Sequence, residues 1–252
     1  MPKSIFKGIS TLKKYEKYFC QNQYSGNLAA ESIFSFVDKN SFVCLTAPHA
    51  TNSTIHKHFK ESDWFTGALV KYLGEKNHFS YIIRNKYWHK KCTIISFILK
   101  NNLDHHYFLD IHAMKNRPFD LAVGIGYCSK EDYKAELKII DKLCKKYNIK
   151  YVVNHPSYTG QPGLTGGLQR KIASANVVQL EWIKEFRDFN AHPEKVSQIT
   201  LPFIEELACL LNTLSKEKLS HRISAKYTLL QKVKNKINWF KICINYFLRR
   251  FN

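Results

Sequence analysis

The stretch Tyr107 to Ala113, which reads Tyr-Phe-Leu-Asp-Ile-His-Ala, constrains the fold more than any other part of the sequence. Four apolar residues surround one carboxylate, Asp110, as in a buried strand of an α/β sheet. The run ends next to a histidine, His112. Pockets of open α/β sheets lie beyond the carboxyl ends of the strands. We therefore interpret this stretch as a buried strand that delivers His112 to a functional edge.

Two other apolar runs have the same form. Residues 41–49 (Ser-Phe-Val-Cys-Leu-Thr-Ala-Pro-His) stop at His49, and residues 175–181 (Ala-Asn-Val-Val-Gln-Leu-Glu) stop at Glu181. Strand and helix candidates alternate through most of the remaining chain. This alternation predicts an α/β domain whose central sheet is mostly parallel or mixed and carries helices on both faces.

The remaining elements follow from apolar periodicity and from helix-capping residues. Ser62 or Asp63 is placed to cap a helix that starts at residue 64, and Ser129 caps another. Pro202 should kink or split the last helix. The expected strands are 79–84, 121–126 and 151–154, and the expected helices are 64–73, 129–147 and 193–214. Residues 3–19 are expected to form a surface helix or an arm, and residues 92–103 a strand or a buried helix, with the helix favoured by their length. The expected loops are 50–60 and the glycine-rich 155–167.

Length and composition favour one folded domain, residues 1–222, followed by a helical tail, residues 223–252. The chain has 252 residues, 44% of them hydrophobic, with few prolines and glycines, so it can bury a full core. Its seven cysteines are odd in number and scattered, which favours reduced thiols over a disulfide framework or a cysteine-held metal. No signal peptide and no membrane-length apolar window is recognised. We therefore expect a cytoplasmic protein.

The charge balance indicates an anionic partner. Lys and Arg total 39 against 20 acidic residues, a formal net charge of +19. In residues 223–252, apolar side chains recur at helical spacing beside basic ones, without any acidic residue. This pattern fits a helix docked on the body equally well as a basic amphipathic helix on an anionic membrane. The second alternative would place the protein at the inner face of the membrane, and nucleic acid is the less favoured partner.

The histidines and carboxylates near strand ends suggest a metal site. A catalytic zinc ion is usually held by three protein groups, with one position left for water. His49, a carboxylate from Glu61 or Asp63, and His112 would supply that set, and Glu181 would move the proton. On composition alone a structural role is favoured for any single histidine, because eleven histidines place several near strand ends by chance.

Several short blocks follow one another in a distinctive order: Pro48-His49-Ala50, Glu61 to Ala68, Leu109 to Ala113, Arg117 to Asp120 with Gly124, Asn154 to Gly167, and Gln179 to Glu181. In this order they resemble the N-formylglutamate amidohydrolase-like family, and the likeness covers roughly residues 41–190. The resemblance implies a zinc carboxypeptidase-type fold, related to zinc N-acetylmuramoyl-L-alanine amidases. It also implies zinc-dependent hydrolysis of N-acylated amino acids, peptide-like molecules or other amides.

The resemblance assigns roles to individual residues. His49 and His112 become the imidazole ligands, and Asp63 the acidic ligand, with Glu61 as the alternative. Glu181 becomes the general base and acid, although a strand-end carboxylate could instead form a salt bridge. Asp110 is expected to orient a ligand histidine rather than to bind the metal itself, although its place on the same face as His112 is compatible with either role.

Substrates of this family carry a carboxylate, which calls for an arginine in the pocket. Arg84, Arg117 and Arg170 are the candidates, and Arg117 is also assigned to the catalytic set. Asn154, from one of the matching blocks, is assigned to substrate binding. The alternative for Arg117 is an ion pair with Asp120 that fixes the loop.

Two features depart from a plain N-formylglutamate amidohydrolase: the basic ends of the chain and the histidine-rich loop His56-Lys57-His58. They leave the substrate open. The charge of the chain supports a second hypothesis, in which a catalytically lapsed amidohydrolase-like fold serves as a basic binding module that acts at membranes or nucleic acid through its termini. This hypothesis explains the charge better and the ordered blocks worse.

Overall fold

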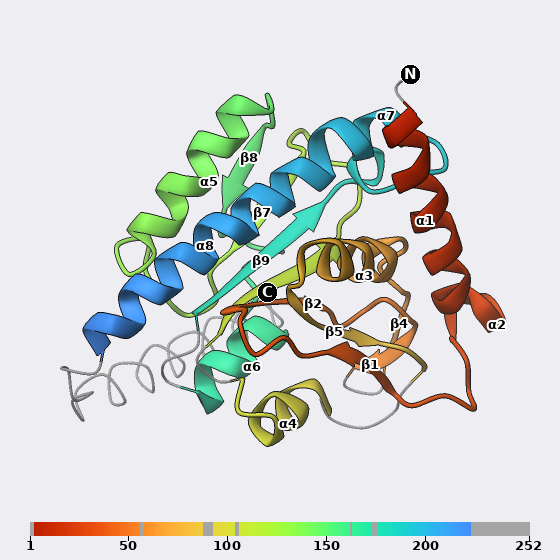
Figure 1. Ribbon diagram of the computed structural model, residues 1–252, viewed down its shortest axis with the longest axis horizontal. Helices are drawn as coiled ribbons and strands as arrows, with labels where there is room; N and C mark the ends of the chain where they lie inside the picture. Colours follow the sequence, from red (N-terminus) through yellow and green to blue (C-terminus); the bar gives the residue numbers. More distant parts are fainter. Residues whose placement is uncertain are drawn as a thin grey trace, which may run out of the picture.

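The structure is a computed structural model that describes residues 3–55, 58–87, 93–103, 106–161, 163–172 and 176–222 (Figure 1). Within these residues a seven-stranded sheet has the order β1-β5-β2-β6-β9-β7-β8. Its strands are β1 Ile33–Phe36, β2 Val43–Ala47, β5 Ser80–Arg84, β6 Tyr107–Ala113, β7 Leu121–Gly124, β8 Tyr151–Val153 and β9 Asn176–Trp182. The β1–β5 and β7–β9 pairs are antiparallel, and the other neighbouring pairs are parallel. The predicted mixed α/β sheet is confirmed.

The three strands predicted to carry functional residues are neighbours in the middle of the sheet. The β2, β6 and β9 strands are parallel, and their register sets Asp110 beside Thr46 on one side and His112 beside Glu181 on the other. Side chains alternate between the two faces of a strand. Phe108, Asp110 and His112 therefore share one face of β6, which is apolar at its start and polar at its carboxyl end.

Helices cover both faces of the sheet, as predicted. The larger core holds residues of α1 Lys3–Phe19, α3 Thr66–Asn77, α5 Lys134–Lys146 and α8 Leu201–Arg222. A separate cluster on the Phe108 face holds residues of α4 Thr93–Lys100 and α6 Leu164–Lys171. Figure 1 shows α5 and α8 running side by side, and α1 packs against α3. The functional face of β6 therefore continues into the smaller cluster.

Shorter elements complete the described chain. They are α2 Gln21–Tyr24, a hairpin of β3 Ser53–Ile55 and β4 His58–Lys60, a 3-10 turn Lys184–Phe186, α7 Pro193–Lys195 and a π-helical segment Val196–Thr200. The π-helical segment ends just before α8, where Pro202 stands in the first turn. The helical backbone continues from α7 through this segment into α8, since the Leu201 N–H donates to the Val196 carbonyl. Pro202 has no N–H to donate, and the predicted helix is divided into segments just before it.

Two predicted loops contain regular structure. Within residues 50–60, strands β3 and β4 pair with each other, and the glycine-rich stretch before β9 contains helix α6. Leu164 and Leu168, four residues apart, are buried in the smaller cluster and anchor one face of α6. The packing of these two leucines outweighs the low helix propensity of Gly166 and Gly167.

Helix α5 begins five residues later than predicted. Ser129 and Asp132 do exchange hydrogen bonds, since the Ser129 N–H donates to Asp132 Oδ2 at 2.9 Å and the Asp132 N–H donates to Ser129 Oγ at 3.2 Å. This pair closes a separate turn, and the helix starts only at Lys134.

Two predicted features lie outside the described residues: the tail, residues 223–252, and the histidine-rich residues 56–57 with the side chain of His58. The predicted division into a body and a tail at residue 222 therefore stays a prediction. Among the helices that are described, none combines the length and apolar character needed to cross a bilayer.

Candidate active site

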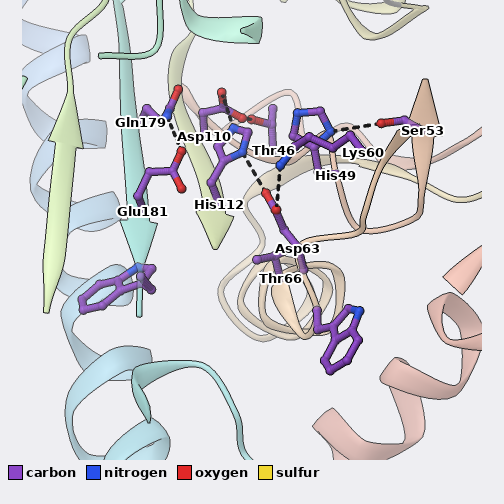
Figure 2. A network of polar contacts seen from close by, with 12 residues as sticks. Thr46, His49, Ser53, Lys60, Asp63, Thr66, Asp110, His112, Gln179 and Glu181 are labelled. Atoms are coloured by element: carbon purple, nitrogen blue, oxygen red, sulfur yellow. Dashed lines mark hydrogen bonds and ion pairs between the residues drawn. The ribbon is translucent and has the colours of Figure 1, made fainter. Parts of the chain in front are cut away.

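His112 stands at the centre of the site, near the carboxyl end of β6, with both ring nitrogens beside carboxylates (Figure 2). Its Nδ1 lies 3.0 Å from Asp63 Oδ2, and its Nε2 lies 3.0 Å from Asp110 Oδ2. The Nε2 contact has the length of an ion pair but not the direction of a hydrogen bond, so we treat it as ionic. Burial lowers the pKa of His112, but Asp110 and Asp63 outweigh burial and raise it well above its ordinary value.

Asp110 is fully buried and is held by two threonines. Thr46 of β2 donates its hydroxyl to Asp110 Oδ1 at 2.7 Å, and Thr165 of α6 donates to Oδ2 at 3.2 Å. Side chains from β2 and α6 thus hold the Asp110 carboxylate of β6 in place beside His112. Such a carboxylate fixes the orientation and the tautomer of a metal-binding imidazole. The position suits the orienting role predicted for Asp110.

Asp63 reaches the site from the turn before α3. Its carbonyl accepts hydrogen bonds from the Thr66 N–H and hydroxyl, while its carboxylate points to His112. The expected cap by Ser62 or Asp63 is wrong, because Phe65 is the N-cap residue and no side chain caps the helix. The Asp63 carboxylate is instead committed to the site, and Glu61 is exposed. Burial raises the pKa of Asp63, but the hydrogen bond from His112 and nearby positive charges lower it well below its usual range.

His49 follows β2 by two residues and lies beside His112. The two ring centroids are 5.1 Å apart, and His49 Nδ1 lies 3.5 Å from Ser53 Oγ in the hairpin. The Asp63 N–H donates to the His49 carbonyl at 2.6 Å, which ties the two segments together. Burial holds the pKa of His49 well below its ordinary value. A neutral imidazole is the form that binds a metal ion.

Two imidazoles and a carboxylate, from His49, His112 and Asp63, are groups that zinc binds. Their side chains would have to move to surround one ion. Among the residues that the structure describes, no three His, Cys, Asp or Glu side chains are arranged to hold a metal ion as they stand. His112 Nδ1 and Asp63 Oδ2, however, are 3.0 Å apart. Two ligands of a tetrahedral zinc ion, each about 2 Å from the metal, lie about 3.3 Å apart. The pair is close to this spacing, and in the structure the same 3.0 Å is a hydrogen bond between the two groups. A third ligand, such as His49, would have to move toward them.

Glu181 stands at the end of β9, beside His112 in the register. Gln179, two residues earlier on the same face, donates to Glu181 Oε1 at 2.6 Å. Burial raises the pKa of Glu181 to about 7, although the charge of His112 opposes this. Arg187, a possible salt-bridge partner, donates instead to the carbonyls of Trp64 and Trp182. A carboxyl group with a pKa near 7 is suited to both accepting and donating a proton.

Of the predicted substrate-binding arginines, Arg84 is the one whose charge is shown to act on a residue of the site. It is buried at the end of β5, and its charge acts on His49. Arg117 Nε donates to the Tyr158 hydroxyl at 3.3 Å, and Asp120, its suggested partner, accepts the Lys150 N–H at 2.8 Å.

Arg170 and Asn154 are engaged in local structure. Arg170 lies on α6, is exposed, and donates to the Tyr127 hydroxyl and the Gln161 carbonyl. Asn154 has a φ of 54° and accepts the Ile125 N–H at 3.0 Å, which shapes the chain beyond β8. Their assignment to substrate binding stays a prediction.

The structure adds four residues that the sequence did not reveal as part of the site. Thr46 and Gln179 were accessible to prediction, because the two-residue strand period places them on the face that carries Asp110 and Glu181. Thr165 lies on helix α6, where the glycine-rich sequence had predicted a loop. The fourth, Lys60, contacts Asp63 at 3.1 Å from the hairpin, and nothing in the sequence marked it.

The fold and the site together are a mixed α/β sheet, covered by helices on both faces, with an imidazole–carboxylate cluster at the carboxyl ends of its central strands. No protein-family model matches the sequence, and no curated protein sequence matches it either. A solved bacteriophage poly-gamma-glutamate hydrolase is similar in structure, with a TM-score of 0.50, 14% identity, and coverage of 72% of this chain and 89% of that one. An N-formylglutamate amidohydrolase from Ralstonia eutropha JMP134 also has a TM-score of 0.50, with 10% identity and coverage of 72% and 99%. These similarities confirm the predicted amidohydrolase-like fold.

Proposed function

We propose that the protein is a metal-dependent amide hydrolase in which His49, Asp63 and His112 hold a zinc ion and Glu181 transfers the proton. One observation carries the proposal. His112 lies between the carboxylates of Asp63 and Asp110 at a strand end, beside a buried glutamate. Carboxylate groups on both sides of an imidazole fit a metal ligand with its orienting partner better than a histidine of the core.

The residues divide the chemistry between them. A zinc ion held there would polarise an amide carbonyl and make a water molecule more acidic. Glu181 accepts a proton from the attacking water as the new carbon–oxygen bond forms. It then delivers that proton to the amine nitrogen as the carbon–nitrogen bond breaks. Asp110 keeps His112 oriented throughout.

For the substrate, we propose an amide of an acidic amino acid, such as an N-acylated glutamate or a peptide-like molecule. The two similar structures are named for poly-gamma-glutamate and N-formylglutamate, which are both anionic amides. A chain with a net charge of +19 attracts such molecules. Arg84, close to His49, is the first candidate to bind the carboxylate of the substrate.

A metal analysis tests the site. We expect the purified protein to bind one zinc ion, and His49→Ala and His112→Ala each to abolish tight binding in a competition titration with a chromogenic chelator. His192→Ala, a partly exposed histidine outside the site, is the matched control and should bind zinc like the wild type. Tight zinc binding by His112→Ala would contradict the proposed ligand set.

A hydrolysis assay tests the role of Glu181. With N-formylglutamate, other N-acylglutamates and poly-gamma-glutamate as substrates, Glu181→Gln should lower kcat by about 100-fold or more. Its zinc affinity should stay within a few-fold of the wild type. Full activity of Glu181→Gln would exclude this residue as the proton carrier.

A second function is favoured by the charge of the chain. We propose that residues 223–252 bind an anionic membrane surface, which would place a cytoplasmic enzyme at the inner face of the membrane. Membrane binding and hydrolysis are compatible, because the two functions use different parts of the chain.

A further inference from the structure

Lys60 places a positive charge inside the proposed metal site. It is the last residue of β4, and its Nζ lies 3.1 Å from Asp63 Oδ1, while the other oxygen of that carboxylate faces His112. Figure 2 shows the Lys60 ammonium directed toward Asp63 from the side of the two imidazoles. One carboxylate thus serves a histidine and an ammonium at the same time.

The charge of Lys60 acts on more than its direct partner. It influences His49 and Glu181 as well as Asp63, so the ammonium lies within electrostatic reach of two proposed ligands and of the proposed proton carrier. A divalent cation bound by Asp63 would therefore lie close to a second positive charge. Two cations at one carboxylate repel each other strongly in a buried site.

The two partners differ in their freedom to move. The Asp63 side chain is 5% exposed, whereas the Lys60 side chain is 37% exposed. Lysine carries its charge on a flexible stem of four carbons, so its ammonium can turn to water while its backbone stays in the hairpin. Asp63 is fixed by its turn and by His112, so Lys60 is the partner that can leave.

We propose that Lys60 is a tethered competitor for the metal ion: its ammonium pairs with Asp63, and zinc binds by displacing it toward solvent. This inference rests on the proposed function, because it requires Asp63 to be a metal ligand. A purely structural ion pair makes a different prediction, since its loss would lower stability without tightening zinc binding.

Zinc titrations of the full chain test the proposal, with the metal ion itself as the probe. Lys60→Met, which keeps the length but removes the charge, should bind zinc about 10-fold more tightly than the wild type, in the range by which groups around the ligands tune metal affinity. Lys60→Arg should bind zinc no more tightly, because a guanidinium holds a carboxylate at least as well as an ammonium. Lys145→Met, which removes an exposed lysine–aspartate pair on α5, is the control and should leave zinc affinity unchanged.

Thermal unfolding provides a second readout. In the presence of a chelator, Lys60→Met should melt below the wild type, because Asp63 loses its counter-charge. With excess zinc, the order of the two melting temperatures should reverse. If Lys60→Met does not fold, Lys60→Gln takes its place in both measurements.

The possible failures are distinguishable. Wild-type protein that binds zinc while Lys60→Met binds it equally or more weakly would overturn the role of Lys60 alone. Tighter zinc binding by Lys60→Arg would also overturn it. Folded wild-type and Lys60→Met proteins that both fail to bind zinc would overturn the proposed function and, with it, this inference.

Discussion

The proposed metal binding depends on the orientation of the His112 imidazole. His112 lies between Asp63 and Asp110, and Asp110 is in turn fixed by the hydroxyls of Thr46 and Thr165. The four groups come from the turn before α3, from β6, from β2 and from α6. The direction of the imidazole is therefore set by the fold itself.

The first prediction concerns Asp110. Asp110→Asn keeps an oxygen for Thr46 but removes the negative charge behind His112, so zinc affinity should fall about 10- to 100-fold. Chelator competition measures this loss. Asp141→Asn, at a partly exposed carboxylate of α5, controls for the loss of one charge. An unchanged zinc affinity of Asp110→Asn would show that Asp110 has no orienting role.

At the scale of elements, helix α1 is coupled to the start of α3 through a buried carboxylate. Glu16 of α1 accepts the Tyr24 hydroxyl at 2.6 Å and the Phe65 N–H at 3.1 Å. Phe65 lies two residues after Asp63. Burial raises the pKa of Glu16 to about 7, against an ordinary value of 4.5, although these hydrogen bonds act to lower it.

The second prediction is a pH dependence of stability. A carboxyl group whose pKa is raised by folding favours the folded protein below its unfolded value, and this contribution is lost as the pH rises through the folded value. The free energy of unfolding should therefore fall between about pH 4.5 and pH 7, by up to about 3 kcal/mol from Glu16. Urea unfolding of the wild type and Glu16→Gln across this range isolates the effect, because the variant lacks this titration. Parallel pH profiles of the two proteins would contradict it.

The sequence predicted the central elements better than those that complete the site. The β2, β6 and β9 strands are mostly apolar runs with single polar residues inside them, so their apolar character identified them and placed His112 and Glu181 near their ends. Helix α6 and the β3–β4 hairpin were missed, because two leucines four residues apart and a three-residue pairing are weak local signals. Thr165 and Lys60 were missed with them, since both reach the site only through long-range packing.

At the scale of the whole molecule, the charge of the chain is the property that the fold explains least. An α/β body with the proposed hydrolase site does not require a net charge of +19. Electrostatic attraction to an anionic substrate and to an anionic surface would both benefit from it. Substitution of the basic residues in 223–252 can distinguish attraction to the substrate from attraction to a surface.

The third prediction uses the intact chain. Replacing Lys232, Lys234 and Lys236 together by glutamate should abolish co-sedimentation with vesicles that contain phosphatidylserine, because it reverses the charge of the proposed membrane-binding segment. Hydrolysis of small N-acylglutamates should not change. Replacing Lys134, Lys138 and Lys145 of α5 by glutamate is the control with the same change in charge. Equal loss of vesicle binding in both variants would indicate attraction by overall charge, without a dedicated segment.

The shared face of Phe108, Asp110 and His112 has a consequence for molecules that misfold. A strand that pairs one residue out of register turns all its side chains to the opposite face. Such an error in β6 would bury Asp110 and His112 in the larger apolar core and direct Leu109 and Ile111 into the proposed catalytic cluster. A compact but inactive register isomer is therefore strongly disfavoured. In a preparation of this protein, the fraction of molecules competent to bind metal should equal the fraction that is correctly folded.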